Sequence, residues 1–189
     1  MSFTDAFRAL NSLKRRRVIR KYAVIGAVAA TAYMEPLATE DLDIIVLVDT
    51  DEEYLTVFNN IAENAEGQEG MHYVLGGVPV QIFPSTTMPL YRDTVEAAAQ
   101  VRIGGLRVNF ASIEHLILLY LEAFREKDQF RVRILYRSAD LARLNALLKR
   151  FDNAEERLTR RLQGLRGTSV PREGEVAPPP GKDEPGPQT

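Results

Sequence analysis

The stretch from residue 22 to residue 48 constrains this chain more than any other. An apolar run ends at Gly26-Ala27, a segment of small residues follows, and Asp41-Leu42-Asp43 leads into a second apolar run. Successive side chains of a β-strand point to opposite faces, so residues two apart share a face. The pattern predicts strands at 22–25 and 43–48 joined by a short helix. It places Asp41 and Asp43 side by side at the head of the second strand.

Two carboxylates at this spacing suit a cation. Held close together, Asp41 and Asp43 repel each other unless a positive charge lies between them. Ligand sets made of oxygen atoms alone suit Mg²⁺, which is usually shared with the phosphates of a substrate. The Gly26-Ala27 turn would place backbone N–H groups and a helix N-terminus near the same edge, where they suit a phosphate anion. The competing interpretation of the two acids is a solvated loop that leads into a strand.

These residues resemble the nucleotidyltransferase superfamily of the DNA polymerase β type. Its signature is a strand, a Gly-Gly or Gly-Ser turn, a short helix, and then Asp-x-Asp on the next strand. Here the turn reads Gly26-Ala27, and thirteen residues separate it from Asp41. The approach to Asp41 looks like the small prokaryotic branch, which includes abortive-infection and toxin–antitoxin proteins. Members often carry Arg-x-Thr before the first Asp, whereas this chain has Leu37 in place of the Arg.

The resemblance covers about residues 20–150 and implies a fold and an activity. The fold is α/β (α+β): a mixed sheet flanked by helices, with a helical C-terminal segment. The implied activity is transfer of a nucleotidyl group from an NTP to a hydroxyl on RNA, protein or a small molecule, with Mg²⁺ as cofactor. The implied catalytic and metal residues are Asp41 and Asp43. Gly26, Ala27 and Lys127 would bind the nucleotide, since related toxins often carry a Lys-Asp pair at the position of Lys127-Asp128. Those toxins have a further Asp where this chain has Arg131, and the competing interpretation of Lys127 is a charged helix end.

The third acid of the superfamily pattern is missing. It normally lies on a neighbouring strand between apolar residues, and the best match here places Gln81 there. An amide offers a carbonyl oxygen to a metal but supplies no charge and is a poor base. Glu35, Glu40 and Asp93 are the possible substitutes. The alternative function is therefore a catalytically degenerate domain that binds a nucleotide or a partner, for example within a toxin–antitoxin pair.

The remaining sequence divides into a core, a helical segment and a tail. We expect a nucleotidyltransferase-like core at 1–110, a helical segment at 111–166 and a disordered tail at 167–189, which is rich in Pro, Gly and charge. In the core, periodicity predicts helices at 2–20, 51–66 and 91–99 and hairpins centred on Gly76-Gly77 and Gly104-Gly105. Beyond it, a helix opens at Ser112, a helical pair covers 128–136 and 138–150, and 157–166 extends the second.

Composition excludes several classes of protein. The chain has no cysteine, so it has no disulfide and no thiolate metal site. No apolar run approaches the roughly 20 residues of a membrane span, and we expect a cytoplasmic protein without a membrane partner. The formal net charge is −2, so RNA would have to bind a local patch such as the basic run 14–17, which we interpret as a solvated helix face. The histidines, His72 and His115, are far apart in sequence, and His115 is expected at the surface.

Overall fold

The computed structural model describes residues 3–36 and 38–166. The tail predicted at 167–189 and Leu37 lie outside the described residues. The strands are β1 (Tyr22–Val24), β2 (Leu42–Val46), β3 (Gly67–Glu69), β4 (His72–Leu75), β5 (Val78–Pro84), β6 (Ala99–Ile103) and β7 (Leu106–Phe110). The helices are α1 (Phe3–Arg15), α2 (Gly26–Ala30), α3 (Asp51–Asn64), α4 (Pro89–Glu96), α5 (Ile113–Ala123), α6 (Glu126–Leu135), α7 (Leu141–Phe151) and α8 (Arg157–Arg166).

The strands form one mixed sheet in the order β3-β4-β5-β2-β1-β7-β6. β2 pairs with β5 in parallel and with β1 in antiparallel orientation, and β1 pairs with β7 in parallel. The hairpins β4–β5 and β6–β7 extend the sheet on its two sides. The α/β fold class expected from the sequence is thus confirmed. β2, the strand that begins beside Asp41, lies in the interior of the sheet.

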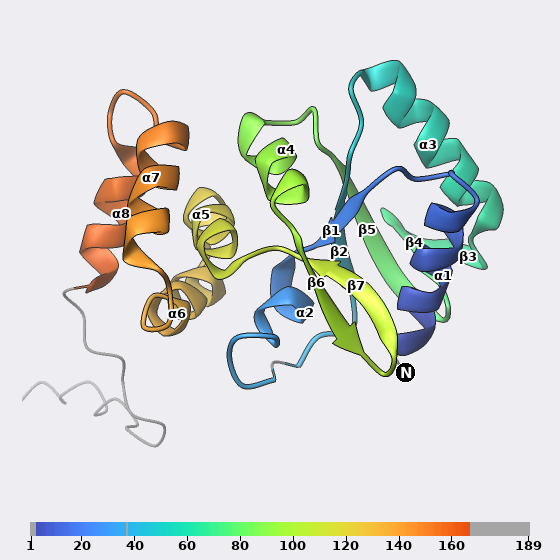
Figure 1. Ribbon diagram of the computed structural model, residues 1–189, viewed down its shortest axis with the longest axis horizontal. Helices are drawn as coiled ribbons and strands as arrows, with labels where there is room; N and C mark the ends of the chain where they lie inside the picture. Colours follow the sequence, from blue (N-terminus) through green and yellow to red (C-terminus); the bar gives the residue numbers. More distant parts are fainter. Residues whose placement is uncertain (1–2, 37, 167–189) are drawn as a thin grey trace, which may run out of the picture.

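Helices cover both faces of the sheet (Figure 1). α1 and α3 lie on one side, where both pack against β4 and β5. α4 and α5 lie on the other side, and α4 contacts β1 and β2. α6, α7 and α8 follow α5 and pack on it as a separate group of helices. All strands precede α5 to α8 in sequence.

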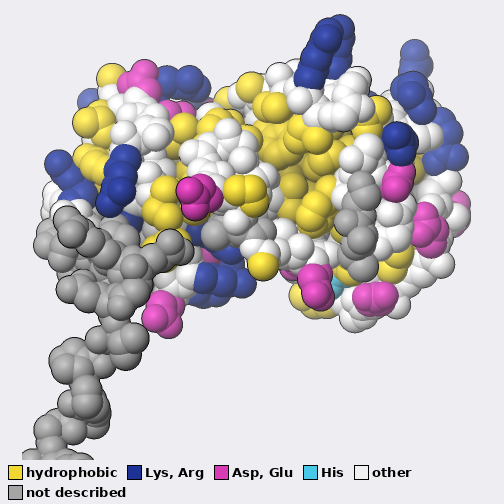
Figure 2. Space-filling model, turned by 90° about the horizontal axis from the view of Figure 1, so that it is seen from below, with side chains coloured by type: hydrophobic (Ala, Val, Ile, Leu, Met, Phe, Trp, Pro, Cys, Tyr) yellow, Lys and Arg dark blue, Asp and Glu magenta, His cyan; other side chains and the backbone are white. Residues whose placement is uncertain are grey.

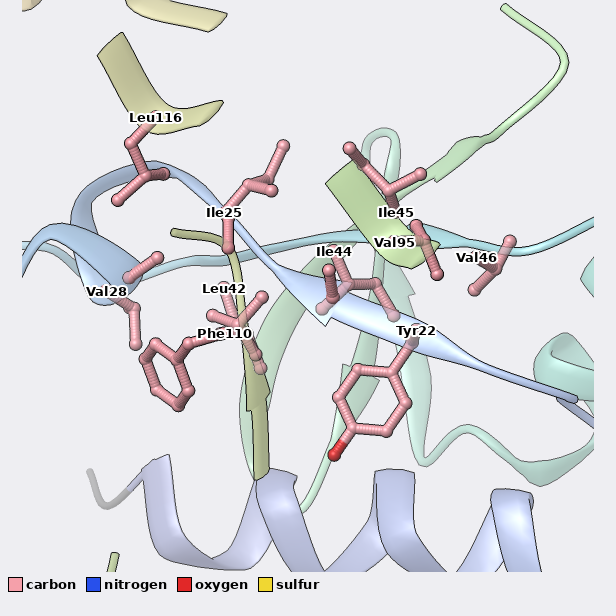
Figure 3. Close-up of a cluster of buried hydrophobic side chains, with 14 of the residues drawn as sticks. Tyr22, Ile25, Val28, Leu42, Ile44, Ile45, Val46, Val95, Phe110 and Leu116 are labelled. Carbon is pink, nitrogen blue, oxygen red and sulfur yellow. The ribbon is translucent and has the colours of Figure 1, made fainter. Parts of the chain in front are cut away.

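A continuous core holds these layers together. Side chains from β1, β2, β7 and α4, among them Tyr22, Ile44, Phe110 and Val95, meet in the cluster of Figure 3. The Tyr22 ring is fully buried, and burial raises the pKa of its hydroxyl to about 12. Because a buried hydroxyl must keep a hydrogen bond, Tyr22 donates to Asn11 Oδ1 over 3.3 Å. The core thereby ties α1 to the strand that carries the Gly26 turn.

Polar caps explain where the longer helices begin. The Thr50 side chain accepts a hydrogen bond from the Glu53 amide at the start of α3. Ser112 accepts one from the His115 amide at the start of α5, as its sequence position predicts. Asp140 accepts from two amides at the start of α7. Each cap satisfies backbone donors that the first helical turn leaves without a partner.

Several expected boundaries were wrong. α1 ends at Arg15 rather than near residue 20, and the chain turns away at Arg17 with a φ of 62°. The segment 157–166 is a helix of its own, separated from α7 by a turn. Within α3, Leu55 is 58 % exposed although it is apolar, and Val57 is buried. Tertiary packing selects the face of a helix when its periodicity offers more than one apolar stripe.

Among the described helices, none combines the length and the apolar character needed to cross a membrane.

Candidate active site

Asp43 and the Gly26 turn are packed against each other at the end of β1. The Ile25 amide donates to the Asp43 carbonyl over 2.9 Å, which fixes the turn to β2. Gly26 has a φ of +64°, and a methyl group on it would lie 2.2 Å from Asp43 Oδ2. Glycine is therefore required twice, once for its backbone angle and once because the Asp43 carboxylate fills the space beside it. The sequence predicted that Gly26 lies near the acid pair, and Gly26 does lie beside Asp43.

Replacing Gly26 by alanine tests this close approach. Gly26→Ala should lower the free energy of unfolding by about 2 kcal/mol, because the positive φ alone costs about 1 kcal/mol and the carboxylate must also move. Gly70→Ala is the matched control, since Gly70 has a φ of +60° with no atom within 4 Å of the added methyl group. Urea unfolding measures both variants. Equal losses would show that the Asp43 contact contributes nothing.

Gln81 lies beside Asp43, as predicted. β2 and β5 are parallel, and their register pairs Asp43 with Gln81. The flanking residues Val80 and Ile82 are buried, whereas Gln81 is half-buried on the opposite face. Strand alternation therefore presents the amide, not an apolar side chain, next to the Asp43 carboxylate. The position at which the superfamily pattern has its third acid is occupied by a neutral group.

A cavity of about 500 Å³ opens over Asp43, Gln81 and Gly26. Phe83 of β5 lines it on the side of the sheet. Tyr91 of α4 and Met88, the residue before α4, also line it. α5 and the residues after it form the facing wall with Leu119, Tyr120, Glu122, Ala123 and Arg125. The cavity is of the size that small-molecule sites have. It combines an acidic end, a cationic edge and an aromatic side, so both a phosphate and a planar ring find suitable surfaces.

Burial and charge raise the pKa of Asp43. The largest cause is burial, and the negative charge of Asp41 adds to it. The positive charges of His72, Arg125 and Lys127 act in the opposite direction. A carboxylate that is both desolvated and repelled by a second carboxylate is relieved by a bound cation. The predicted repulsion within the acid pair is therefore present in the electrostatics of Asp43.

Asp41 opens into a different hollow from Asp43. Its side chain is 47 % exposed and lies with His72 in a hollow of about 580 Å³, which Thr39, Glu40 and Glu69 also line. The Thr39 hydroxyl donates to Asp41 Oδ1 over 2.6 Å, and His72 Nε2 lies 4.0 Å from Asp41 Oδ2. Histidine surface is visible beside acidic side chains on this side of the molecule (Figure 2). A cation shared by Asp41 and Asp43 stays a prediction.

Ala27 and Lys127 are not part of the cavity wall. Ala27 is buried within α2. The helix whose N-terminus was expected to bind a phosphate has only five residues. Lys127 is exposed in the first turn of α6 and acts on Asp43 through its charge alone. Arg125, two residues earlier, lines the cavity instead. Periodicity could not distinguish the two cations, because Arg125 lies in the link between α5 and α6, outside either helix.

Tyr120 connects α5 to the Gly26 turn through a hydrogen bond. Its hydroxyl donates to the Gly26 carbonyl over 2.8 Å, and the residue is 4 % exposed. Burial is the largest cause that raises its pKa, so the hydroxyl stays a hydrogen-bond donor. Tyr120 lies among the buried, mostly apolar residues of α5. Its hydroxyl was the only signal of a polar role, and nothing in the chain near Tyr120 pointed to Gly26 as the partner.

His115 corrects an expectation. The sequence predicted a surface position, but His115 is 2 % exposed. Its Nε2 lies 2.9 Å from Asp93 Oδ2 and its Nδ1 lies 2.9 Å from Ser112 Oγ. Arg150 of α7 donates to the other Asp93 oxygen over 2.6 Å. Because α4 and α7 both pack on α5, a helix position that periodicity assigns to solvent becomes interior.

None of the proposed substitutes replaces the third acid in this cavity. Asp93 is engaged by His115 and Arg150, and Glu35 and Glu40 are exposed outside the wall. Within residues 3–36 and 38–166, no group of three or more His, Cys, Asp or Glu side chains could hold a metal ion. Asp41, two residues away in the chain, and the amide of Gln81, across the sheet, are the candidate companions of Asp43 in a metal site. This set suits Mg²⁺ only when phosphates complete the coordination.

Solved structures share this fold. No protein-family model matches the chain, and no curated protein matches it. A crystal structure of an antigenic nucleotidyltransferase-like protein from Paracoccidioides brasiliensis superposes with a TM-score of 0.57 at 16 % identity, over 87 % of this chain and 88 % of the other. ANT(2")-Ia in complex with adenylyl-2"-tobramycin gives 0.52 at 14 % identity, over 84 % and 94 %. At these identities the likeness establishes the fold alone. The chain therefore has the nucleotidyltransferase-like fold that its sequence predicts.

Proposed function

We propose that the protein transfers a nucleotidyl group from an NTP to a hydroxyl, with Mg²⁺ as cofactor. The observation that carries this proposal is the position of Asp43, between the Gly26 turn and Gln81 at the end of a 500 Å³ cavity. The acceptor belongs to the broad class already expected: RNA, a protein or a small molecule with a hydroxyl. The same proposal places the protein in the cytoplasm, where NTPs are made and used.

The residues around the cavity suit the cofactor in part. Asp43 and Asp41 would hold Mg²⁺ with the Gln81 oxygen, and the NTP phosphates would supply the remaining ligands. When bound, Mg²⁺ neutralises phosphate charge and polarises the phosphorus–oxygen bonds. The protein itself would orient the triphosphate along Gly26 and Arg125. The aromatic side at Phe83 and Tyr91 would exclude water and hold a planar ring.

Thermal unfolding with each NTP, with and without Mg²⁺, tests binding. We expect a rise in melting temperature that needs both NTP and Mg²⁺ for its full size. Release of pyrophosphate in the presence of pooled RNA, protein and polyol acceptors then tests transfer. Glu63→Gln serves as a control, because Glu63 is an exposed carboxylate on α3 far from the cavity wall. A protein that shows neither an NTP-dependent shift nor pyrophosphate release contradicts the proposal.

Gln81 favours a second candidate function. A neutral amide cannot take a proton from the acceptor and contributes no charge to a metal site. The same cavity could then serve a nucleotide- or partner-binding module without efficient catalysis, of the kind expected within a toxin–antitoxin pair. Under this alternative, NTP binding is retained while pyrophosphate release is absent.

Restoring the acid distinguishes the two candidates. Gln81→Asp should strengthen Mg²⁺ binding about tenfold, because a second charged oxygen joins Asp43 in the register of β2 and β5. Without metal the variant should lose roughly 0.5–1 kcal/mol of stability from like-charge repulsion. Titration calorimetry with MgCl₂ measures the first effect. Gln100→Asp, the same change on an exposed position of β6, should alter neither quantity.

If Mg²⁺ affinity is unchanged in Gln81→Asp, then Gln81 is no part of a metal site. If affinity rises and pyrophosphate release appears only in the variant, the natural chain is the binding module.

A further inference from the structure

Arg125 is held at the cavity wall by a buried carboxylate. Asp128 is fully buried, and its two oxygens accept from Arg125 Nε over 2.6 Å and from Arg125 Nη2 over 3.3 Å. The Asp128 carboxylate also accepts from the Arg125 backbone amide. This two-point contact fixes the plane of the guanidinium as well as its position. Arg125 therefore does not sweep through solvent as an unrestrained surface arginine does.

The cluster around Asp128 carries a net positive charge. Arg131 Nη1 lies 3.4 Å from Asp128 Oδ1, so one carboxylate is shared by two guanidinium groups. Arg131 is half-buried and lies over the Tyr120 ring, 5.4 Å from the centroid. Two positive charges and one negative charge leave one positive charge. That charge is placed at the rim, because Arg131 is 12 % exposed whereas Arg125 is 60 % exposed.

Arg125 keeps donors for a ligand. A guanidinium has five N–H groups, and the contacts to Asp128 use Nε and one hydrogen of Nη2. Within the described chain no hydrogen bond occupies Nη1. The planar fork of Arg matches phosphate oxygens in a way that a flexible ammonium group does not. An anion in the cavity would meet donors that are already oriented.

The other charges of the cavity do not oppose an anion strongly. Glu122 forms an ion pair with Arg157, which neutralises it. Gln81 is uncharged where the superfamily pattern has an acid. Asp43 is then the one lining carboxylate without a paired cation among the described residues, at the Gly26 end of the cavity. The Arg125 edge is therefore the part of the wall that favours negative charge.

We propose that Arg125, positioned by Asp128, binds the polyphosphate chain of a nucleotide directly, without a divalent cation. The inference rests on the proposed function for the identity of the ligand as a nucleotide, and it deepens that proposal by assigning the anion-binding group. It also separates Arg125 from Lys127, the cation that the sequence had favoured. In this role Arg125 contacts the ligand, and Asp128 acts through Arg125.

Calorimetric titration with inorganic tripolyphosphate in EDTA at low salt tests the inference. The wild-type chain should bind, and Arg125→Ala should bind at least about tenfold more weakly, because a charge-assisted hydrogen bond is lost. Arg102→Ala is the matched control, since Arg102 is an exposed arginine on β6 outside the cavity. It should leave affinity unchanged. Wild-type protein that does not bind tripolyphosphate in EDTA overturns the inference.

Two further variants separate charge from geometry. Lys127→Ala should retain most of the affinity, and a loss as large as that of Arg125→Ala would overturn the assignment to Arg125. Arg125→Lys keeps the charge but cannot form the two-point contact with Asp128, so it should bind several-fold more weakly than wild type. Full affinity in Arg125→Lys would show that Asp128 has no positioning role. Asp128→Asn, provided that circular dichroism shows a native fold, should also bind tripolyphosphate more weakly than wild type.

Failure of this inference is distinguishable from failure of the proposed transfer. If NTP binds only with Mg²⁺ and Arg125→Ala binds it as wild type does, the inference fails and transfer stands. If tripolyphosphate binds through Arg125 but no pyrophosphate is released, transfer fails and the inference stands.

Discussion

Asp43→Asn should abolish any Mg²⁺-dependent reaction while making the protein more stable. Asp43 is the carboxylate at the end of the cavity, and a neutral amide in its place cannot offset the charge of a cation. The rate of nucleotidyl transfer should fall by about a thousandfold, which corresponds to the several kcal/mol that a positioned metal supplies. The free energy of unfolding should rise by about 0.5–2 kcal/mol, because the ionised Asp43 is desolvated and repelled by Asp41.

The difference in stability between Asp43→Asn and wild type should depend on pH. The folded-state pKa of Asp43 lies above its ordinary value of 3.8, mainly through burial and then through Asp41. Protonation of Asp43 therefore stabilises the folded state, and the stability so gained is complete below the unfolded-state pKa. It is lost as the pH rises through the raised folded-state pKa. The advantage of Asp43→Asn over wild type should thus be largest at about pH 7 and shrink toward about pH 4.

Urea unfolding of both proteins across this pH range measures the difference. Glu63→Gln again serves as the control, since it removes an exposed carboxylate outside the cavity wall. An advantage of Asp43→Asn that stays constant from neutral to acidic pH would mean that the ionised carboxylate is not the source of the instability. A variant that keeps its Mg²⁺-dependent thermal shift would remove Asp43 from the metal site.

Gly76→Ala should destabilise the protein strongly. Gly76 begins the turn between β4 and β5 with a φ of +60°, and a methyl group on it would lie 2.4 Å from the Asp5 carbonyl carbon of α1. The obstacle is backbone, which cannot rotate away as a side chain can. The backbone angle costs about 1–2 kcal/mol and the overpacked contact about 1–3 kcal/mol more. We expect a total loss of about 3 kcal/mol in the free energy of unfolding.

The neighbouring glycine provides the control. Gly77 has a φ of +71°, and no atom lies within 4 Å of an added methyl group. Glu66 accepts hydrogen bonds from the amides of both glycines, so the two positions share that partner. Gly77→Ala should therefore cost only about 1 kcal/mol, the backbone term. Equal losses in the two variants would show that α1 moves away from the turn without cost.

Local sequence patterns were sufficient for the elements of the core. Alternation and the two glycine pairs predict both hairpins, because a two-residue turn with positive φ leaves few other structures for the chain. The run from Tyr22 to Val48 predicts a strand, a glycine turn and a second strand with the acids at its head. Period-two alternation places Gln81 opposite Val80 and Ile82, and the parallel register of β2 and β5 brings it to Asp43. The alternation, the turns and the acids at the head of the strand depend on residues a few positions apart, whereas the pairing of Asp43 with Gln81 joins two strands that are distant in sequence.

The tertiary structure alone decided which distant groups meet. Arg125, the residue before α6, lies in the cavity wall, whereas Lys127 in the first turn of α6 does not. Tyr120 reaches the Gly26 carbonyl across 94 positions of sequence, and His115 becomes interior because α4 and α7 cover α5. Spacing within an element is set by local backbone geometry, which the sequence specifies directly. Contacts between elements depend on how complete surfaces pack, and that is a property of the whole chain.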